Sequence, residues 1–223
     1  MHKKPNLRTR IDAAWLIFKA FEQELFSIPN NGGYSATLLL AKANGVNMGH
    51  KYIVGFILTH FYRILRVFPN SDPLMGFILP AAKREKWWKA PLFAFLAMAT
   101  FDLISGHLGI WTIITSVTYA AIALSYTFLL KGAKPSLSTY IPAGIAGVIA
   151  FDTITGPLMS TFLFSQPLWL SVLGQVPFTL MHIVSASFSI LLITPFLDKA
   201  VMEEASGLIS AAISHMKGWR IEA

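Results

Sequence analysis

Residues 168–197 read LWLSVLGQVPFTLMHIVSASFSILLITPFL and contain no Asp, Glu, Lys or Arg over 30 positions. The hydrocarbon core of a bilayer is about 30 Å thick and an α-helix rises about 1.5 Å per residue, so about 20 apolar residues span it. This stretch is long enough to cross a membrane as one helix. It therefore predicts an integral membrane protein.

Five further apolar segments precede this one along the chain. They are 52–68, 74–82, 91–105, 110–130 and 138–164. Segments 110–130 and 138–164 also reach the spanning length, whereas 52–68 and 91–105 need flanking residues. Segment 74–82 is too short alone and is expected to be re-entrant or tucked between other helices. The pattern predicts an all-α polytopic membrane protein, a six-transmembrane-helix bundle, with four spans plus a hairpin as the alternative.

The composition agrees with a membrane location. Of the 223 residues, 54% are hydrophobic and 13% are charged, and the mean hydropathy is +0.57. Soluble domains carry roughly 25% charged residues, so this chain lacks the polar surface of a water-soluble protein. The chain has no cysteine, which excludes a disulfide scaffold, thiolate zinc sites, iron–sulfur clusters and a cysteine nucleophile.

The distribution of positive charge predicts how the chain is oriented. All 18 Lys and Arg residues except Arg63 and Arg66 fall in four segments, namely 1–51, 83–90, 131–137 and 198–223. The alternate connections, near 69–73, 106–109 and 165–167, carry none. Basic residues in short loops stay on the cytoplasmic side. We therefore expect a multi-pass protein of the cell inner (cytoplasmic) membrane with both termini cytoplasmic, and the net charge of +7 requires no nucleic acid partner.

The apolar segments and the distribution of basic residues divide the chain into three parts. Residues 1–50 form a cytoplasmic N-terminal extension, in which apolar residues recur at helical spacing from Ile11 to Leu25. This predicts an amphipathic helix that binds membrane lipids. Residues 51–200 form the six-helix membrane domain, and residues 201–223 form a cytoplasmic C-terminal tail.

A short motif occurs twice in the apolar region. Residues 101–106 read FDLISG and residues 151–156 read FDTITG, at an offset of 50 residues. Duplicated helices are common in transporters, whose binding sites lie where interrupted helices meet. The repeat predicts that Asp102 and Asp152 both lie toward the outer face, at similar depth.

Three stretches carry a resemblance to a known family. They are FYRILRVFPNSDPL at 61–74, the FDLISG turn at 101–106, and the last apolar segment, from FTLMHIVS at 178–185 to TPFLDKA at 194–200. Together they resemble the substrate-binding S component of energy-coupling factor (ECF) transporters, or an uncharacterised membrane family related to it. Two features depart from that family: the Ala-x-x-x-Ala of the first helix is replaced by Gly55 to Thr59, and the N-terminal extension is long.

The resemblance implies both a fold and partners. It implies a six-helix bundle that holds a small vitamin-like or metal substrate in an outer pocket. It also implies a transmembrane coupling subunit and ATPase subunits, which supply the energy. The predicted function is the substrate-binding subunit of an ATP-driven importer for a micronutrient or cofactor precursor. The alternatives are a membrane-embedded enzyme that uses Asp102 and Asp152, and a membrane assembly factor without a ligand.

Ionisable side chains inside a bilayer are costly and are therefore candidates for substrate binding. Asp102 and Asp152 could accept hydrogen bonds from an amine-bearing ligand, or cap helix ends and pair with the two arginines. Arg63 and Arg66 share a helical face and could bind a carboxylate or phosphate. Alternatively, they reach lipid headgroups or neutralise Asp72.

The remaining candidates are polar or aromatic residues of the later segments. His182 and Gln175 could contact a ligand, although membrane histidines often hydrogen-bond a neighbouring helix. Trp111 and Trp169 could stack on a ring-shaped ligand, although interfacial tryptophans are also common membrane anchors.

Signatures of metal sites and enzymes are missing from the sequence. There is no His pair at a spacing of three or four residues and no H-E-x-x-H, so no metal site is expected. There is no G-x-S-x-G, no G-x-x-x-x-G-K-[ST] and no G-x-G-x-x-G. We therefore expect no cofactor, and ATP hydrolysis would come from a partner.

Overall fold

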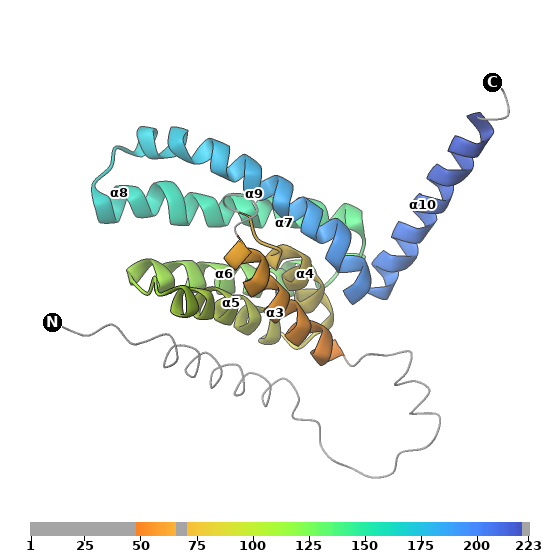
Figure 1. The fold of residues 1–223 in the computed structure, drawn as a ribbon, viewed down its shortest axis with the longest axis horizontal. Coiled ribbons are helices and arrows are strands. Elements are labelled where there is room, and N and C mark those ends of the chain that lie inside the picture. The colour runs from red at the N-terminus through yellow and green to blue at the C-terminus, as the bar shows by residue number, and fades with distance from the viewer. Residues whose placement is uncertain (1–47, 66–70, 220–223) are drawn as a thin grey trace, which may run out of the picture.

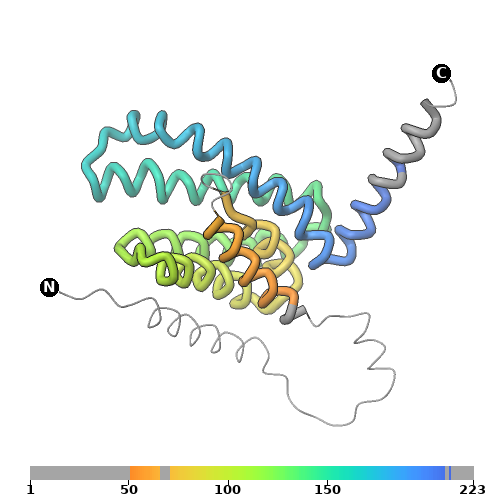
Figure 2. The backbone as a smooth tube through the Cα atoms, viewed as in Figure 1, coloured from red at the N-terminus to blue at the C-terminus, as the bar shows by residue number. Residues whose placement is uncertain are grey.

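The computed structural model describes residues 48–65 and 71–219, and the regular structure within these ranges is helical (Figures 1 and 2). The elements are α3 (Met48–Leu65), α4 (Leu74–Arg84), α5 (Lys89–Ser105), α6 (Ile110–Leu129), α7 (Leu137–Thr153), the π-helical turn η1 (Ile154–Leu158), α8 (Met159–Phe164), α9 (Leu168–Leu197) and α10 (Lys199–Trp219). The N-terminal amphipathic helix and Arg66 lie outside the described residues. The prediction of an all-α fold is confirmed for the described ranges.

Three helical stretches are long and apolar enough to cross a membrane. They are α6, the continuous run Leu137–Phe164 and α9, of 20, 28 and 30 residues. Much of their apolar surface points outward, and Val184 and Phe188 of α9, for example, are 66% and 62% exposed. Large side chains of this kind cost about 1.5–3 kcal/mol each when they face water instead of an apolar medium. The chain therefore associates with a membrane through these helices.

Helix α4 forms the centre of the bundle. Every residue from Leu74 to Ala82 is buried, and α4 contacts α3, α5, α6, α7 and α9. A helix that is hydrophobic on all sides needs such an enclosed position. With 11 residues it rises only about 16 Å, roughly half of the hydrocarbon core. The segment expected to be re-entrant or tucked is thus an internal half-length helix.

The length of α4 is set by contacts at its two ends with α9. At its start, the Ser185 hydroxyl donates to the carbonyl oxygen of Asp72 over 3.4 Å. At its end, the Arg84 guanidinium donates to both carboxylate oxygens of Asp198 over 2.9 and 2.8 Å. Helix α4 therefore runs beside the second half of α9, from its middle to its C-terminal end.

Basic residues gather at this C-terminal end of α9. Lys51 donates from Nζ to the carbonyl oxygen of Phe196 over 2.8 Å, and Lys83 donates to the carbonyl oxygen of Leu130 over 2.7 Å. Carbonyl groups at helix ends have no partner within their own helix, and cations bind them well. Arg84 belongs to the same end, which is the end that the charge pattern predicts to be cytoplasmic.

The close approach of α4 to α9 depends on Gly76. A Cβ atom at this position would lie 2.6 Å from the backbone carbonyl oxygen of Ser189 and 3.0 Å from the Cβ of Ile193. The first of these neighbours is backbone and cannot rotate away. Any larger residue at position 76 would therefore push the two helices apart.

We expect Gly76→Ala to lower the free energy of unfolding by about 1–3 kcal/mol, because the extra methyl group overpacks the α4–α9 contact. Thermal unfolding in detergent measures this. Gly174→Ala is the matched control, since no atom lies within 4 Å of a Cβ at that α9 position. Equal melting temperatures for Gly76→Ala and Gly174→Ala would contradict the close approach.

The Asp198 carboxylate joins three elements at the basic end of the bundle. It is buried, and besides Arg84 it accepts a hydrogen bond from the Tyr140 hydroxyl of α7 over 3.1 Å. Burial raises the pKa of Asp198, but the hydrogen bonds from Arg84 and Tyr140 outweigh it and bring the pKa below its ordinary value. A lowered folded-state pKa stabilises the fold above the ordinary carboxyl pKa, and this stability is lost as the pH falls through the lowered value.

We expect Asp198→Asn to cost about 1–2 kcal/mol of stability at neutral pH, less than a fully buried ion pair because Arg84 is partly exposed. The difference from the wild type should shrink as the pH falls below about 4, where the wild type loses the same contribution. Tryptophan fluorescence during thermal unfolding between pH 7 and pH 3 measures it. Glu203→Gln is the control, because its contact with Lys199 is 4.0 Å long and exposed. A pH-independent difference would refute this role of Asp198.

Candidate functional site

One of the long helical runs contains a π-helical turn. The run Leu137–Phe164 widens into η1 directly after Thr153, and Pro157 within η1 has no N–H for the α-helical ladder. Helix α9 stays α-helical through Gly174 and Pro177. The turn η1 faces this part of α9, because a Cβ at Gly156 would collide with the side chain of Gln175. π-Helical turns are frequent at functional sites.

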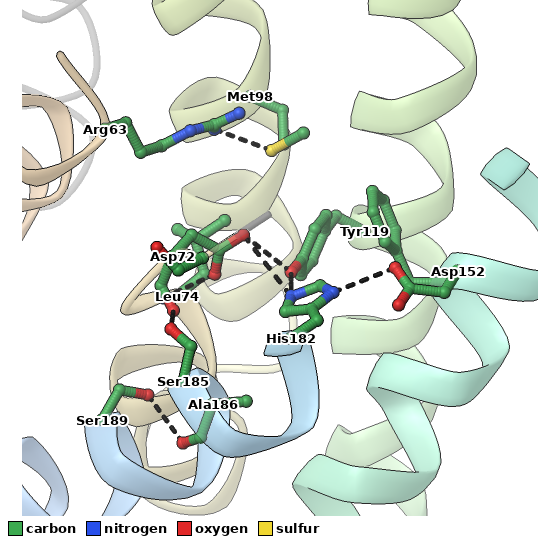
Figure 3. Close-up of polar contacts among 12 residues, drawn as sticks. Arg63, Asp72, Leu74, Met98, Tyr119, Asp152, His182, Ser185, Ala186 and Ser189 are labelled. Carbon is green, nitrogen blue, oxygen red and sulfur yellow. Dashed lines mark hydrogen bonds and ion pairs between the residues drawn. The ribbon is translucent and has the colours of Figure 1, made fainter. Parts of the chain in front are cut away.

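A buried polar cluster begins at Asp152, two residues before η1 (Figure 3). The Nδ1 atom of His182, near the middle of α9, lies 2.9 Å from Oδ1 of Asp152 on α7. Its Nε2 atom lies 3.2 Å from the hydroxyl oxygen of Tyr119 on α6. The same hydroxyl donates to Oδ2 of Asp72 over 3.0 Å. We call Asp72, Tyr119, His182 and Asp152 the polar cluster; all four are buried.

Neighbouring groups hold the polar cluster rigidly in place. The ring of Phe151 packs against Tyr119 with centroids 4.1 Å apart, and it meets the His182 ring edge-on at 6.0 Å. At the other end, Oδ1 of Asp72 accepts a hydrogen bond from the backbone N–H of Leu74 over 3.0 Å. This N–H belongs to the first turn of α4, where a negative charge is favourable. Asp72 therefore both starts α4 and closes the polar cluster.

A cavity of about 440 Å³ borders the polar cluster at one point. Its wall consists of Tyr62 of α3, Asp72 and Pro73 before α4, and side chains of α9 between Met181 and Ile193. The wall is almost entirely apolar, and Asp72 is the acidic residue on it. Val184 and Phe188 also line it, so the cavity opens on the membrane-facing surface of α9. The cavity follows the second half of α9 from Met181 to Ile193, whereas the family resemblance implies a pocket at the outer end.

The structure brings two of the predicted site residues together and keeps the others apart. Asp152 and His182 are in contact in the polar cluster. None of the predicted contacts in the described ranges lines the cavity; these are Asp102, Asp152, Arg63, His182, Trp111, Trp169 and Gln175. Sequence reasoning missed Asp72 and Tyr119 as site residues. Asp72 could have been found as the acid that directly precedes a tucked apolar segment, whereas nothing distinguishes Tyr119 from the other tyrosines of the sequence.

The two aspartates of the repeat have different surroundings. Asp102 accepts a hydrogen bond from the Thr112 hydroxyl over 2.7 Å, at the turn between α5 and α6. Thr112 lies seven residues before Tyr119 on α6, which corresponds to about 10 Å along the axis. The structure therefore does not place Asp102 beside Asp152. The repeated turns differ as well: Gly106 ends α5 in the left-handed conformation with φ of 78°, and the second copy continues into η1.

Arg63 is bound by uncharged groups. Its guanidinium lies over the ring of Phe101 at 4.1 Å, and it donates to the sulfur of Met98 over 2.9 Å (Figure 3). Within the described ranges it forms no ion pair with a carboxylate. Its partners are those of a cation–π contact, not of an arginine fork that binds a ligand anion.

The predicted aromatic and amide contacts lie near the far ends of α6 and α9. Trp111 and Trp169 are 41% and 66% exposed, and the Trp111 indole donates to the carbonyl oxygen of His107 over 2.7 Å. These are the positions of membrane-interface anchors. Gln175 packs against Gly156 and donates to the Thr179 hydroxyl over 3.4 Å.

Gly55 and Thr59, which stand in place of the family's Ala-x-x-x-Ala, form a stripe on α3 that faces the inside of the bundle. Gly55 is packed against the ring of Phe77, and Thr59 is fully buried. The exposed side of α3 instead presents Leu58 and Phe61. A partner helix can therefore reach this apolar side, but it cannot reach the Gly55–Thr59 stripe.

The fold and the site define a class: a helical membrane protein with a buried polar cluster beside an apolar cavity. Among the described residues, no three side chains of the His, Asp and Glu types are grouped so as to hold a metal ion. Comparison with known proteins finds no matching family, no similar characterised protein and no similar solved structure.

Proposed function

We propose that the chain is the substrate-binding membrane subunit of an ATP-driven importer of the energy-coupling factor type. Its ligand is a small vitamin-like micronutrient or cofactor precursor. The observation that carries this proposal is the cavity of about 440 Å³, which has an apolar wall and Asp72 as its acidic lining residue. Pockets for small molecules are typically 300–1,000 Å³, apolar, and equipped with a few polar groups that fix orientation.

Two further features support a binding protein over the alternatives. The π-helical turn η1 packs against α9 at Gln175, and such turns are frequent at functional sites. The binding of Asp102 to Thr112 at the α5–α6 turn, apart from the polar cluster, favours a binding protein over an enzyme that uses Asp102 and Asp152 together. A ligand-free assembly factor would need no cavity beside a buried carboxylate.

The proposal includes an orientation and partners. The basic end of the bundle faces the cytoplasm, the chain crosses the inner membrane six times with α4 as a partial crossing, and both termini are cytoplasmic. A transmembrane coupling subunit and ATPase subunits bind the complex, and the exposed apolar side of α3, at Leu58 and Phe61, is a surface that the coupling subunit can contact.

The absence of cysteine makes the orientation directly measurable. We expect cysteines introduced as Leu108→Cys and Gln166→Cys to react with a membrane-impermeant maleimide in intact cells, because both positions lie in loops without basic residues. Gly132→Cys should react only after the membrane is permeabilised. If Leu108→Cys and Gln166→Cys react from opposite sides of the membrane, the proposed topology is wrong.

Native mass spectrometry of the detergent-purified chain tests for the ligand. We expect a small molecule to remain bound, and Asp72→Asn to weaken its binding about 10–100-fold through loss of a charge-assisted hydrogen bond. Asp102→Asn is the matched control, since Asp102 does not line the cavity. Equal loss of ligand in both variants would mean that Asp72 is not a contact, and absence of any ligand at all would count against the proposed function.

A further inference from the structure

The polar cluster has more hydrogen-bonded contacts than donor hydrogen atoms when its side chains are in their usual ionisation states at neutral pH. Three hydrogen-bonded contacts link its members: Asp72 with Tyr119, Tyr119 with His182, and His182 with Asp152. In addition, Nε2 of His182 lies 3.7 Å from Oδ2 of Asp72. Each of the three hydrogen-bonded contacts needs one hydrogen atom. At neutral pH two ionised aspartates, a tyrosine and a neutral histidine supply two, one from the hydroxyl and one from the imidazole. A third proton is therefore required, and it resides on His182, on Asp72 or on Asp152.

The net charge of the polar cluster also favours the presence of this third proton. Without it, the polar cluster would hold two carboxylates and a net charge of −2 in a buried setting. Like charges that share a low-dielectric site resist full ionisation. Moreover, Oδ2 of Asp152 is buried and has no hydrogen-bond partner among the described residues, so a full negative charge there is poorly compensated. The third proton reduces the net charge to −1.

Each helix packed around His182 contributes a residue to its polar or charged surroundings. Asp72 precedes α4, Tyr119 lies on α6, Asp152 lies on α7, and Arg63 of α3 is the further charged group whose field reaches His182. Helix α5 contributes Met98, which holds the Arg63 guanidinium. Arg63 thus supports one negative charge on the polar cluster but makes no direct contact with it (Figure 3).

The cavity offers a second source of positive charge. Asp72 is the member of the polar cluster that lines the cavity, and Tyr119 connects it to His182 and Asp152. An ammonium group of a ligand beside Asp72 would supply the positive charge that the third proton otherwise supplies. The rest of the cavity wall is apolar and suits the hydrocarbon part of such a ligand.

We infer that the polar cluster binds one exchangeable proton, and that an amine-bearing ligand in the cavity displaces this proton when its ammonium group pairs with Asp72. In this exchange the ligand brings one positive charge and one proton leaves through the cavity to water. The charge of cluster plus ligand therefore stays at −1. The inference depends on the proposed function for the site of the ligand, and it adds the chemical class of the ligand and the coupling to a proton.

The exchange is tested with 4-phenylbutylamine and its uncharged counterpart 4-phenylbutanol, added to the full chain in weakly buffered detergent solution. A pH-indicator dye measures proton release, and calorimetry measures binding. We expect the amine to release about one proton per molecule bound and to bind about tenfold more tightly per pH unit between pH 6 and pH 8. Amine binding without proton release, or equal binding of the alcohol, overturns the inference.

The Tyr119→Phe variant distinguishes proton release from binding of the amine. Removal of this hydroxyl breaks the hydrogen-bonded link between Asp72 and His182, whereas these two residues stay 3.7 Å apart and the ring still packs on Phe151. We expect the variant to bind the amine with less proton release than the wild type. Tyr126→Phe is the matched control on the same face of α6, because its hydroxyl donates to the carbonyl oxygen of Ala143 and not to the polar cluster. Undiminished proton release in Tyr119→Phe contradicts the inference.

A measurement without ligand covers the case in which a variant fails to fold. In the wild-type chain labelled with ¹⁵N-histidine, the third proton predicts that the protonation of His182 or of a buried carboxylic acid changes with pH as a single event, observed by NMR and infrared spectroscopy. Fully ionised carboxylates beside a neutral His182 at pH 7 would refute the proton count. If the proton is present but no ligand of any kind binds, the proposed function fails and the amine exchange fails with it, while the proton site stands.

Discussion

The need to satisfy buried polar groups without water governs the centre of this bundle. Tyr119, His182, Asp152 and Asp72 are enclosed by helices whose outer surfaces are apolar. Polar atoms in such a setting must find partners within the chain. The resulting contacts fix the register of α6, α7 and α9, and they determine where α4 begins, since Asp72 also binds the first turn of that helix.

The half-length helix α4 begins at the polar cluster, and the cavity lies next to this start. Its start is held at the polar cluster and its end is held by the Arg84–Asp198 pair, so it runs beside only the second half of α9. The cavity lies along this same half of α9, between the end of α3 and the start of α4, with Asp72 on its wall. Asp72 thus lines the cavity and also binds the buried Tyr119 hydroxyl, which is the arrangement that the proposed exchange between ligand and proton requires.

The identical FD-x-I-[S/T]-G motifs show how far local sequence decides local structure. Both copies place an Asp in the last turns of an apolar helix, and both aspartates find a hydroxyl or imidazole partner. The first copy ends its helix at Gly106, whereas Gly156 is followed by Pro157 and packs against Gln175. The helix therefore continues through a π turn in the second copy. The neighbouring helix, and not the motif, makes this difference.

The sequence by itself determined the helical class, the membrane association and the approximate bounds of the helices, because hydrophobic length and charge spacing act locally along the chain. It also identified His182 and Asp152, because ionisable groups in apolar segments are conspicuous. Only the tertiary structure decided that Asp72 and Tyr119 complete the cluster, that Asp102 stays apart, and that Gly55 and Thr59 face inward. These outcomes depend on how helices distant in sequence rotate and pack against each other, and spacing along a single helix does not specify that rotation.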